Sequence, residues 1–299
     1  MAWSIHASGV TVSDAASNTA LTAQPRVPRR LLRLNGYLLI GGALMLILAL
    51  LALLAPLLSR VDPNMINPAL ALRPLGSPDH PLGTDNLGRD LLSRLLYGGR
   101  ISLLSSFTAA LISTAISATV GLTAAFFGRW IDLIALRVTD ILMGFPFILL
   151  AILLVAALGP STFNALLAVA IANLPFTLRL VRSEAIRVRE REFITAAKAL
   201  GAGNSRIIWV HMLPNVLSVL ISTFFLTAGW MLGQTSALSF LGLGTQPPTA
   251  DWGSMLAESQ NYMSSMPQIA MLPGLMIVLA SVGMNFFGVG LRAAALREK

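Results

Sequence analysis

The sequence predicts an all-α polytopic membrane protein with six transmembrane helices. Hydrophobic residues make up 55% of the 299 residues and charged residues only 11%, whereas a soluble domain carries about 25% charged residues. So little charge cannot cover a surface that faces water. Charge-free runs of about 20 residues or more, the length that crosses the hydrocarbon core, recur along the chain. These observations together predict helices buried in a lipid bilayer.

The absence of charge places the spans. Asp, Glu, Lys and Arg are missing from the runs 34–59, 101–128, 141–178, 212–250 and 259–291. The third run is too long for one helix, and the turn residues of LGPSTFN at 158–164 divide it. We therefore expect six spans within residues 34–299, at about 35–58, 101–127, 134–158, 163–181, 214–240 and 268–290.

Basic residues predict the orientation. With the N-terminus in the cytoplasm, the inner segments contain 16 of the 21 Lys and Arg residues, and the outer segments contain five, all between Arg60 and Arg100. Because cytoplasmic loops are enriched in Lys and Arg, we expect both termini in the cytoplasm. The outer segments are then 59–100 and 244–266. Residues 1–33 have almost no charge at first and no apolar core, which indicates a disordered cytoplasmic tail.

Several functions are disfavoured by what the sequence lacks. There is no cysteine, the three histidines are scattered, and neither of the two lysines, Lys198 and Lys299, ends a phosphate-binding loop. We expect no catalytic residue, no metal and no cofactor bound by this chain. The net charge of +8 does not indicate nucleic acid, because the basic residues flank apolar runs where membrane topology requires them. Any uphill transport must draw its energy from another chain.

The stretch AAKALGAGNSRIIWVHMLPN at 196–215 is polar and lies between two apolar spans. Its spacing predicts an amphipathic helix from Glu184 to Leu200 that Gly201 ends, since glycine takes the left-handed cap conformation without steric penalty. Asn204 or Ser205 is expected to cap a second short helix. Pro214 suits the first turn of the fifth span. One face of the first helix is predicted to carry Ile186, Phe193, Ala197 and Leu200.

Two interpretations of this loop remain open from periodicity alone. It is either an ordinary charged loop whose apolar face packs on the protein's own spans, or a docking element for a partner. Small alanines allow a partner to approach closely, and two helices bent at a glycine form a compact projection.

The stretch resembles the EAA loop of ABC importer permeases, whose pattern is E-A-A-x3-G-x9-I-x-L-P. Matching residues are Ala196, Ala197, Gly201, Leu213 and Pro214, while Thr195 replaces the Glu and His211 the Ile. Two further stretches, HPLGTDNLGRDLLSRLLYGGRISL at 80–103 and LSFLGLGTQPPTADWGSML at 238–256, are similar to the dipeptide, oligopeptide and nickel permeases of that class. The similarity covers residues 30 to 297.

The resemblance implies a type I ABC importer permease fold in a bacterial inner membrane. Residues 183–213, which we name the coupling loop, would dock in a cleft of a cytoplasmic ATPase, with contacts from the five matching residues and from Phe193 and Arg206. The implied partners are a second homologous permease, two ATP-binding subunits that carry the ATP and magnesium, and an extracytoplasmic solute-binding protein. The solute would be a di- or oligopeptide, or alternatively nickel or another small solute.

The outer segments contain charged and aromatic residues to which the sequence alone assigns more than one role. Asp85, Arg89 and Asp90 suit a metal or substrate site, but a local ion-pair and capping network is favoured, in which Asp85 caps a helix over 86–97. Residues 250–263 are predicted to form a short amphipathic helix at the outer surface, where Trp252 and Tyr262 suit the membrane interface. The resemblance implies that these segments contact the binding protein.

The solute pathway is marked only by polar residues in the fifth span. Gln234, Thr235, Ser236 and Ser239 are polar enough to line a passage, or they form hydrogen bonds between helices. Two rivals to the importer are a sodium-coupled secondary carrier and a membrane scaffold without transport activity. Spans that lack a central ionisable residue disfavour the carrier, because coupled carriers often place such groups there.

Overall fold

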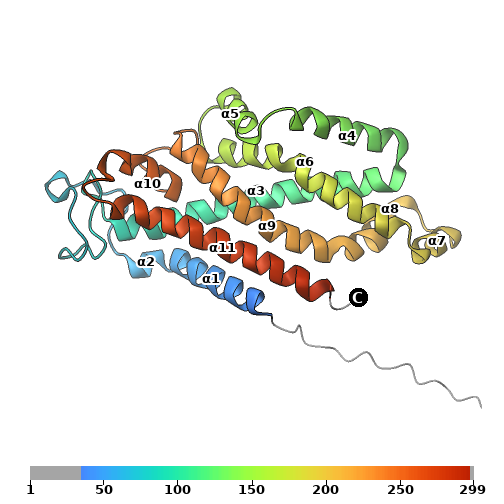
Figure 1. Ribbon diagram of the computed structural model, residues 1–299, viewed down its shortest axis with the longest axis horizontal. Coiled ribbons are helices and arrows are strands. Elements are labelled where there is room, and N and C mark those ends of the chain that lie inside the picture. The colour runs from blue at the N-terminus through green and yellow to red at the C-terminus, as the bar shows by residue number, and fades with distance from the viewer. Residues whose placement is uncertain (1–34, 297–299) are drawn as a thin grey trace, which may run out of the picture. The chain divides into compact units, whose positions relative to one another are not determined.

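The computed structural model describes residues 35–296, with side chains to Ala294, and these residues form a helical bundle without a β-strand among them (Figure 1). The tail predicted over 1–33 lies outside this range. The elements are α1 (Gly36–Leu53), α2 (Ala55–Leu58), the 3-10 turn η1 (Pro68–Leu70), α3 (Leu91–Phe127), α4 (Arg129–Met143), α5 (Phe147–Leu158), α6 (Thr162–Arg189), α7 (Glu192–Ala199), α8 (Asn204–Arg206), the π-helical turn η2 (Ile207–Met212), α9 (Leu213–Phe240), α10 (Trp252–Ser259), the 3-10 turn η3 (Gln260–Tyr262) and α11 (Gln268–Leu296).

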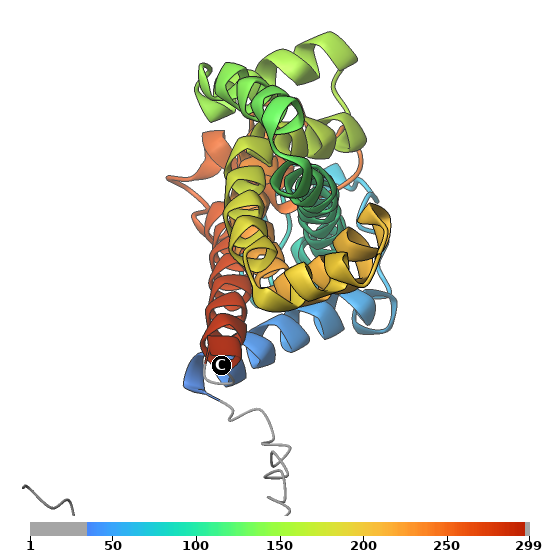
Figure 2. The ribbon, with the colours of Figure 1, turned by 90° about the vertical axis from the view of Figure 1, so that its right-hand side faces the viewer.

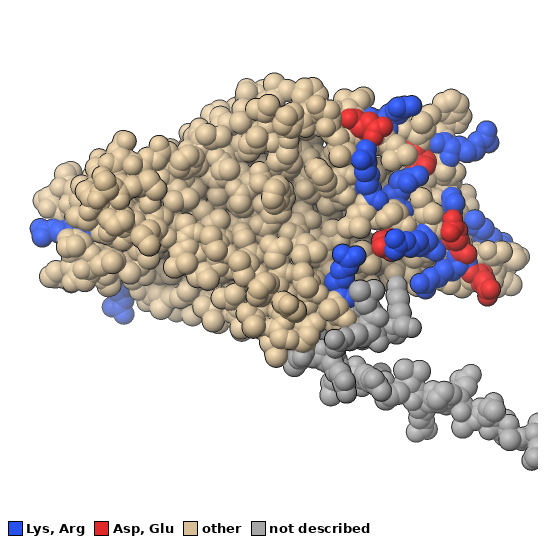
Figure 3. All heavy atoms as spheres, viewed as in Figure 1, with Lys and Arg blue, Asp and Glu red and all other residues tan. Residues whose placement is uncertain are grey.

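The predicted all-α membrane fold is confirmed. Between residues 35 and 296, five helices are long and apolar enough to span a bilayer, or six when the bent pair α4 and α5 counts as one span. Charged side chains on the face seen in Figure 3 gather toward the two ends, with an uncharged band between them. Figure 1 places the predicted coupling loop, with α7 and α8, at one end and α10 at the opposite end.

The second span begins ten residues earlier than predicted. α3 starts at Leu91 and runs for 37 residues to Phe127, which is about 55 Å at 1.5 Å per residue. The carboxylate of Asp90 accepts a hydrogen bond from Ser93 N at 2.7 Å and thereby caps the helix. Because this length exceeds the roughly 30 Å hydrocarbon core, α3 extends beyond the uncharged band. The predicted cap was wrong: Asp90 caps the helix, and Asp85 lies in the loop before it.

The third span is not the continuous helix predicted over 134–158. α4 already begins at Arg129, inside the predicted loop, and α5 is bent by 93° relative to α4. The break falls at Gly144–Phe145–Pro146. Pro146 has no N–H for a helical hydrogen bond and restricts the residue before it, so the apolar run cannot continue as one straight helix.

The core between α3 and α6 is unusually polar. Ser113 and Ser117 of α3 lie 3.1 and 2.6 Å from Thr177 Oγ1 of α6, and Asn173 Nδ2 donates to Ser113 Oγ at 3.3 Å. All four residues are buried. Small residues let membrane helices approach closely, and hydroxyls then bond across the contact. A Cβ on Gly121 would meet Val181 at 3.1 Å, which shows how close the two helices lie.

Candidate functional site

The coupling loop begins on a helix that is longer than expected. α6 continues from the membrane to Arg189, and Glu190 and Arg191 then break the chain direction before α7. The predicted single helix from Glu184 to Leu200 was therefore wrong. Val188 and Ile194 are both buried in one cluster, yet six positions correspond to 240° around a straight helix. Only a turn between them lets both side chains reach that cluster.

The face predicted for that helix changes accordingly. Ile194 is the buried residue of α7, whereas Phe193 is 37% exposed and Leu200 is 88% exposed. Ala196 is also exposed, and Ala197 is half-buried. Figure 2 views the molecule from this end, with the coupling loop toward the viewer. The loop therefore packs Ile194 on its own spans, with Ile186 of the predicted face partly buried in the same cluster, and exposes Phe193, Ala196 and Leu200 to its surroundings.

Gly201 ends α7 as predicted. Its φ is +81°, a conformation that side chains other than glycine and asparagine rarely adopt. Ala202 N donates to Ala197 O and Gly201 N to Lys198 O, both at 3.0 Å. This pair of bonds is the Schellman arrangement, which satisfies carbonyls at the end of a helix. The left-handed glycine thus fixes the direction in which the chain leaves α7.

The second short helix starts differently from the prediction. Gly203, in an extended conformation, is the N-cap of α8, and Asn204 is the first helical residue. Neither Asn204 nor Ser205 caps the helix through its side chain. Glycine is itself an accepted N-cap residue, so the chain can turn at two glycines without a polar cap. Arg206, the last residue of α8, is exposed.

From α8 the helix continues through η2 into α9 without a gap. Ile207, Ile208 and Met212 of η2 are buried and fix this half of the coupling loop to the bundle. Pro214 lies in the first turn of α9, as predicted. Since proline cannot donate to the carbonyl of the preceding turn, the wider π-helical turn just before it accommodates the missing bond. Leu213 is half-buried and Pro214 is exposed.

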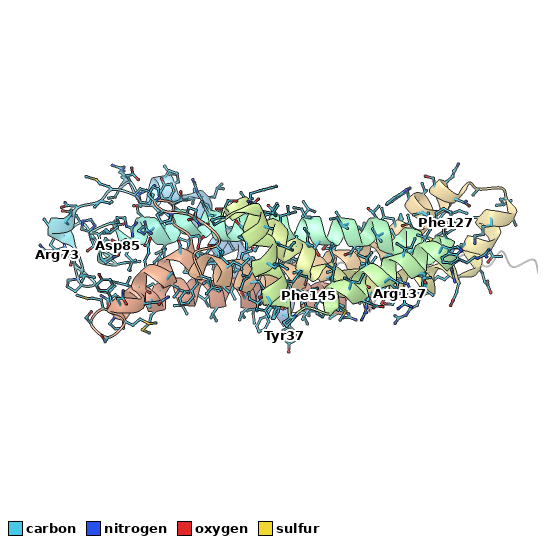
Figure 4. The ribbon with its side chains drawn as sticks, turned by 90° about the horizontal axis from the view of Figure 1, so that it is seen from above. Tyr37, Arg73, Asp85, Phe127, Arg137 and Phe145 are labelled. Atoms are coloured by element: carbon cyan, nitrogen blue, oxygen red, sulfur yellow. The ribbon has the colours of Figure 1, made fainter. Side chains whose placement is uncertain are left out.

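At the opposite end, four charged side chains form one network. Asp85 Oδ2 accepts a hydrogen bond from Arg89 Nε at 2.5 Å, and Glu258 Oε2 accepts from Arg89 Nη2 at 2.5 Å and from Arg94 Nη2 at 2.8 Å. Arg94 Nε lies 3.4 Å from Asp85 Oδ2. Two carboxylates thus balance two buried guanidinium groups. Figure 4 labels Asp85 at this end and Phe127 at the other.

The predicted ion-pair network around Asp85 and Arg89 is present. Asp90 follows Arg89 in the chain, but its side chain has other partners. Asp90 lies 2.9 Å from His80 Nδ1 and caps α3. Within the described residues, no group of three or more His, Asp or Glu side chains is arranged to bind a metal ion. Glu258 completes the network from α10, and sequence reasoning missed it because 164 residues separate it from Arg94.

Trp252 is buried inside the bundle and does not face a membrane interface, contrary to the prediction. Its side chain is 1% exposed, and its indole N–H donates to Leu95 O at 3.0 Å. A Cβ on Gly99 would approach Trp252 Cζ2 to 2.8 Å, so this glycine makes room for the ring. Asp251 caps α10 through a reciprocal bond with Ser254. Tyr262 is half-buried in η3.

Three of the four predicted pathway residues line a polar pocket between α3, α6, α9 and the start of α10. Hydroxyl groups and one carboxylate line much of the pocket, and Ile101, Ala165 and Gly244 complete its wall; the polar residues are Ser102, Ser105, Thr162, Thr235, Ser236, Ser239, Thr245 and Asp251. Ser239 Oγ donates to Asp251 at 2.8 Å, and Thr235 donates to carbonyls of its own helix. Gln234 is half-buried and is not among the lining residues.

Comparison with known proteins places this geometry among transport permeases. A family model described as the binding-protein-dependent transport system inner membrane component matches residues 117–297. A dipeptide transport system permease of Alkalihalophilus pseudofirmus is 44% identical over 88% of this chain and 86% of its own length. A dipeptide transport system permease of Haemophilus influenzae is 37% identical, with 93% and 97% covered.

One further relative and one solved structure are also similar to this chain. A glutathione transport system permease of Pectobacterium atrosepticum is 40% identical over 73% of this chain and 72% of its own length. Among solved structures, an inward-facing MetNI methionine ABC transporter chain superposes with a TM-score of 0.53 at 17% identity, covering 67% of this chain and 96% of that one. At that identity, the likeness concerns the fold alone.

Proposed function

Because the chain belongs to the binding-protein-dependent transport system inner membrane components and is a non-enzymatic permease subunit of an ATP-driven ABC importer, we propose that its solute is a di- or oligopeptide. The supporting observation is that peptide permeases match it at 37–44% identity over most of both chains. Nickel or another small solute is the alternative within the family. ATPase activity resides in partner subunits of such importers, and a binding protein delivers the solute.

We further propose that the coupling loop transmits the movement of the ATPase. Its underside is fixed to the bundle by Ile194, Ile207 and Met212, which are all at most 1% exposed. Its outer side presents Phe193 and Leu200 to a partner. A body that is anchored to the bundle on one side and exposes apolar side chains together with the charged residues Arg191, Lys198 and Arg206 on the other suits docking in a cleft. Closure of two ATPase subunits would then move the helices joined to it.

The complete assembly is proposed to contain two homologous permeases, two ATP-binding subunits and one solute-binding protein. The exposed apolar residues of α5 and α9, among them Leu149, Leu153 and Trp230, suit contact with lipid or with a second permease. Each permease would form half of the translocation pathway. The hydroxyl-lined pocket that contains Thr235, Ser236 and Ser239 is our candidate for the contribution of this chain.

Both termini and the coupling loop are proposed to face the cytoplasm, with 59–100 and 244–266 outside. The chain has no cysteine, so single cysteines report accessibility directly. We expect Leu75→Cys to react with a membrane-impermeant maleimide in intact spheroplasts, and Glu190→Cys to react only after permeabilisation, because basic residues favour the cytoplasm. Both native residues are exposed. The reverse labelling pattern would overturn the orientation.

The proposed function predicts peptide uptake that depends strictly on ATP. In proteoliposomes that contain the full complex and its binding protein, a labelled dipeptide should accumulate with ATP, and an excess of unlabelled dipeptide should abolish the signal. This chain alone should bind no ATP, because neither lysine ends a phosphate-binding loop.

Other outcomes of this experiment point to the rivals. Uptake by this chain alone under a sodium gradient would indicate a secondary carrier. ATP-dependent uptake of a nickel chelate that dipeptides do not inhibit would replace the peptide as solute. Intact uptake after mutation of residues 196–214 would argue against the proposal that the coupling loop transmits the movement of the ATPase.

A further inference from the structure

α4 is held in place by very little apolar packing. Of its 15 residues only Ala135 and Thr139 are buried, although the helix lies beside α6 (Figure 1). Helices in a bilayer are held together by van der Waals packing and interhelical hydrogen bonds, and not by removal of apolar surface from water. Two small buried residues supply few such contacts. The position of α4 along α6 must therefore be determined mainly by other contacts.

Besides its contacts with the neighbouring α3, α4 is joined to α6 by two ion pairs. Asp132 of α4 binds the guanidinium of Arg182 through both carboxylate oxygens, with Arg182 Nη2 2.6 Å from Oδ2. Asp140 accepts from Arg179 Nη2 at 2.6 Å. The two-point pair of Asp132 fixes direction as well as distance and is about one-fifth exposed. The Asp140 pair is nearly half exposed and is the weaker of the two.

The register of these pairs prevents sliding. Asp132 precedes Asp140 on α4, whereas their partners appear in reverse order on α6, so the two helices run antiparallel. The carboxylates are eight positions apart, about 12 Å along the axis, and the arginines three positions apart, about 4.5 Å. The arginine side chains must extend in opposite directions to bridge the difference. A shift of α4 either way along α6 would therefore strain one of the pairs.

The paired helices α4 and α6 each continue into another part of the protein. α6 passes through Glu190 and Arg191 into α7 of the coupling loop. α4 ends at the break 144–146, and beyond it α5 is anchored in the core by Leu150, Ala151 and Val155, all of them buried. α4 therefore lies between the coupling loop and a bent joint whose far side is fixed.

We propose that Asp132 and Asp140 are positioning residues for transport. Their ion pairs make α4 move as one body with α6, so that movement of the coupling loop is delivered to the break at 144–146. The inference rests on the proposed function, because it assumes that the coupling loop is moved by an ATPase. Connected ion pairs and rigid helices can carry such coupling between distant sites.

The test uses the reconstituted complex and the absence of cysteine in this chain. Spin labels at Ile134→Cys on α4 and Phe176→Cys on α6, both exposed positions, report the distance between the helices with and without ATP. Phe176 lies on the same side of Pro175 as the two arginines. In the native background this distance should stay unchanged. In Asp132→Asn/Asp140→Asn it should change with nucleotide, and dipeptide uptake per ATP hydrolysed should fall about threefold to tenfold.

Two controls separate positioning from general damage. Arg137→Gln removes a charge from an exposed position of α4 itself, and the structure records no ion pair for Arg137 within residues 35–294, so it should leave uptake per ATP unchanged. Asp132→Arg/Arg182→Asp restores the ion pair with the charges exchanged. Its dipeptide uptake per ATP hydrolysed should therefore be higher than that of the double Asn variant.

Two results would overturn the proposal: an interhelical distance that changes with ATP in the native chain, or a normal uptake ratio in the double Asn variant. Absence of ATP-driven uptake by the native complex would instead count against the proposed function.

Discussion

Gly201→Val is expected to lower ATP-driven uptake by about tenfold while the protein still inserts and the ATPase still hydrolyses ATP. At φ +81° a β-branched residue is strongly disfavoured, with a cost of about 1–3 kcal/mol. Nothing lies within 4 Å of the added Cβ, so the effect arises from the backbone and not from a clash. Relief of the strain would break the Schellman bonds of Ala202 and Gly201 and change the angle between α7 and α8.

The chain supplies two matched controls for this substitution. Gly201→Asn should retain most activity, because asparagine tolerates the left-handed conformation. Gly203→Ser should be nearly neutral, since Gly203 has extended backbone angles, open space around it and an N-cap position that favours serine.

The measurements are membrane abundance, co-purification with the ATPase, ATP hydrolysis and dipeptide uptake. Equal activity of the Val and Asn variants at position 201 would show that the left-handed turn is not needed for coupling.

The sequence correctly predicted those structural features that depend only on residues close together in the chain. The charge-free runs located five spans and the apolar part of the bent pair α4 and α5, because a helix in lipid must be apolar over its own length. Gly201 and Pro214 were placed correctly, since each fixes the backbone through its own covalent structure. The break at 144–146 had a local signal too, the Gly-Phe-Pro sequence, but the high hydropathy on both sides of it masked that signal.

Tertiary contacts determined the features that were missed. Arg94 and Arg100 suggested that the second span begins after them, yet Arg94 is neutralised by Glu258 and Arg100 binds the carbonyls of Ala52 and Leu53 at the end of α1. The turn at Glu190 has no local breaker and follows from the burial of Ile194. Trp252 resembled an interfacial residue and is buried against Gly99. The partners of Arg94, Arg100 and Trp252 are all distant from them in the sequence, so no local pattern reveals these contacts.

Arg89→Leu is expected to abolish most uptake by disrupting the network at the end opposite the coupling loop. Arg89 is 2% exposed and binds both Asp85 and Glu258. Its removal leaves two carboxylates with one guanidinium, that of Arg94. Breaking a buried pair by deleting one partner costs about 3–5 kcal/mol. Asp85 also accepts from the N–H groups of residues 87 and 89, so a shift of Asp85 away from its lost partner would disturb the loop before α3.

The expected readout is local. Limited proteolysis should cut between residues 60 and 90, whereas the helices should stay inserted and the coupling loop should still bind the ATPase. Arg60→Leu is the matched control, because Arg60 is exposed and the structure records no ion pair for it within residues 35–294. That variant should resist proteolysis and transport normally.

A second substitution tests the charge argument itself. Asp85→Asn removes one negative charge but retains the amide oxygen that can accept the two backbone N–H groups. In the background of Arg89→Leu it leaves one carboxylate, Glu258, opposite one guanidinium, Arg94. Since an unpaired buried charge is what costs most, the double variant should be more protease-resistant and more active than Arg89→Leu alone. Asp85→Asn by itself should impair the protein, because two arginines then share one carboxylate. If the losses of protease resistance and activity in the two single variants simply add in the double variant, the network depends on the packing of its side chains and not on charge balance.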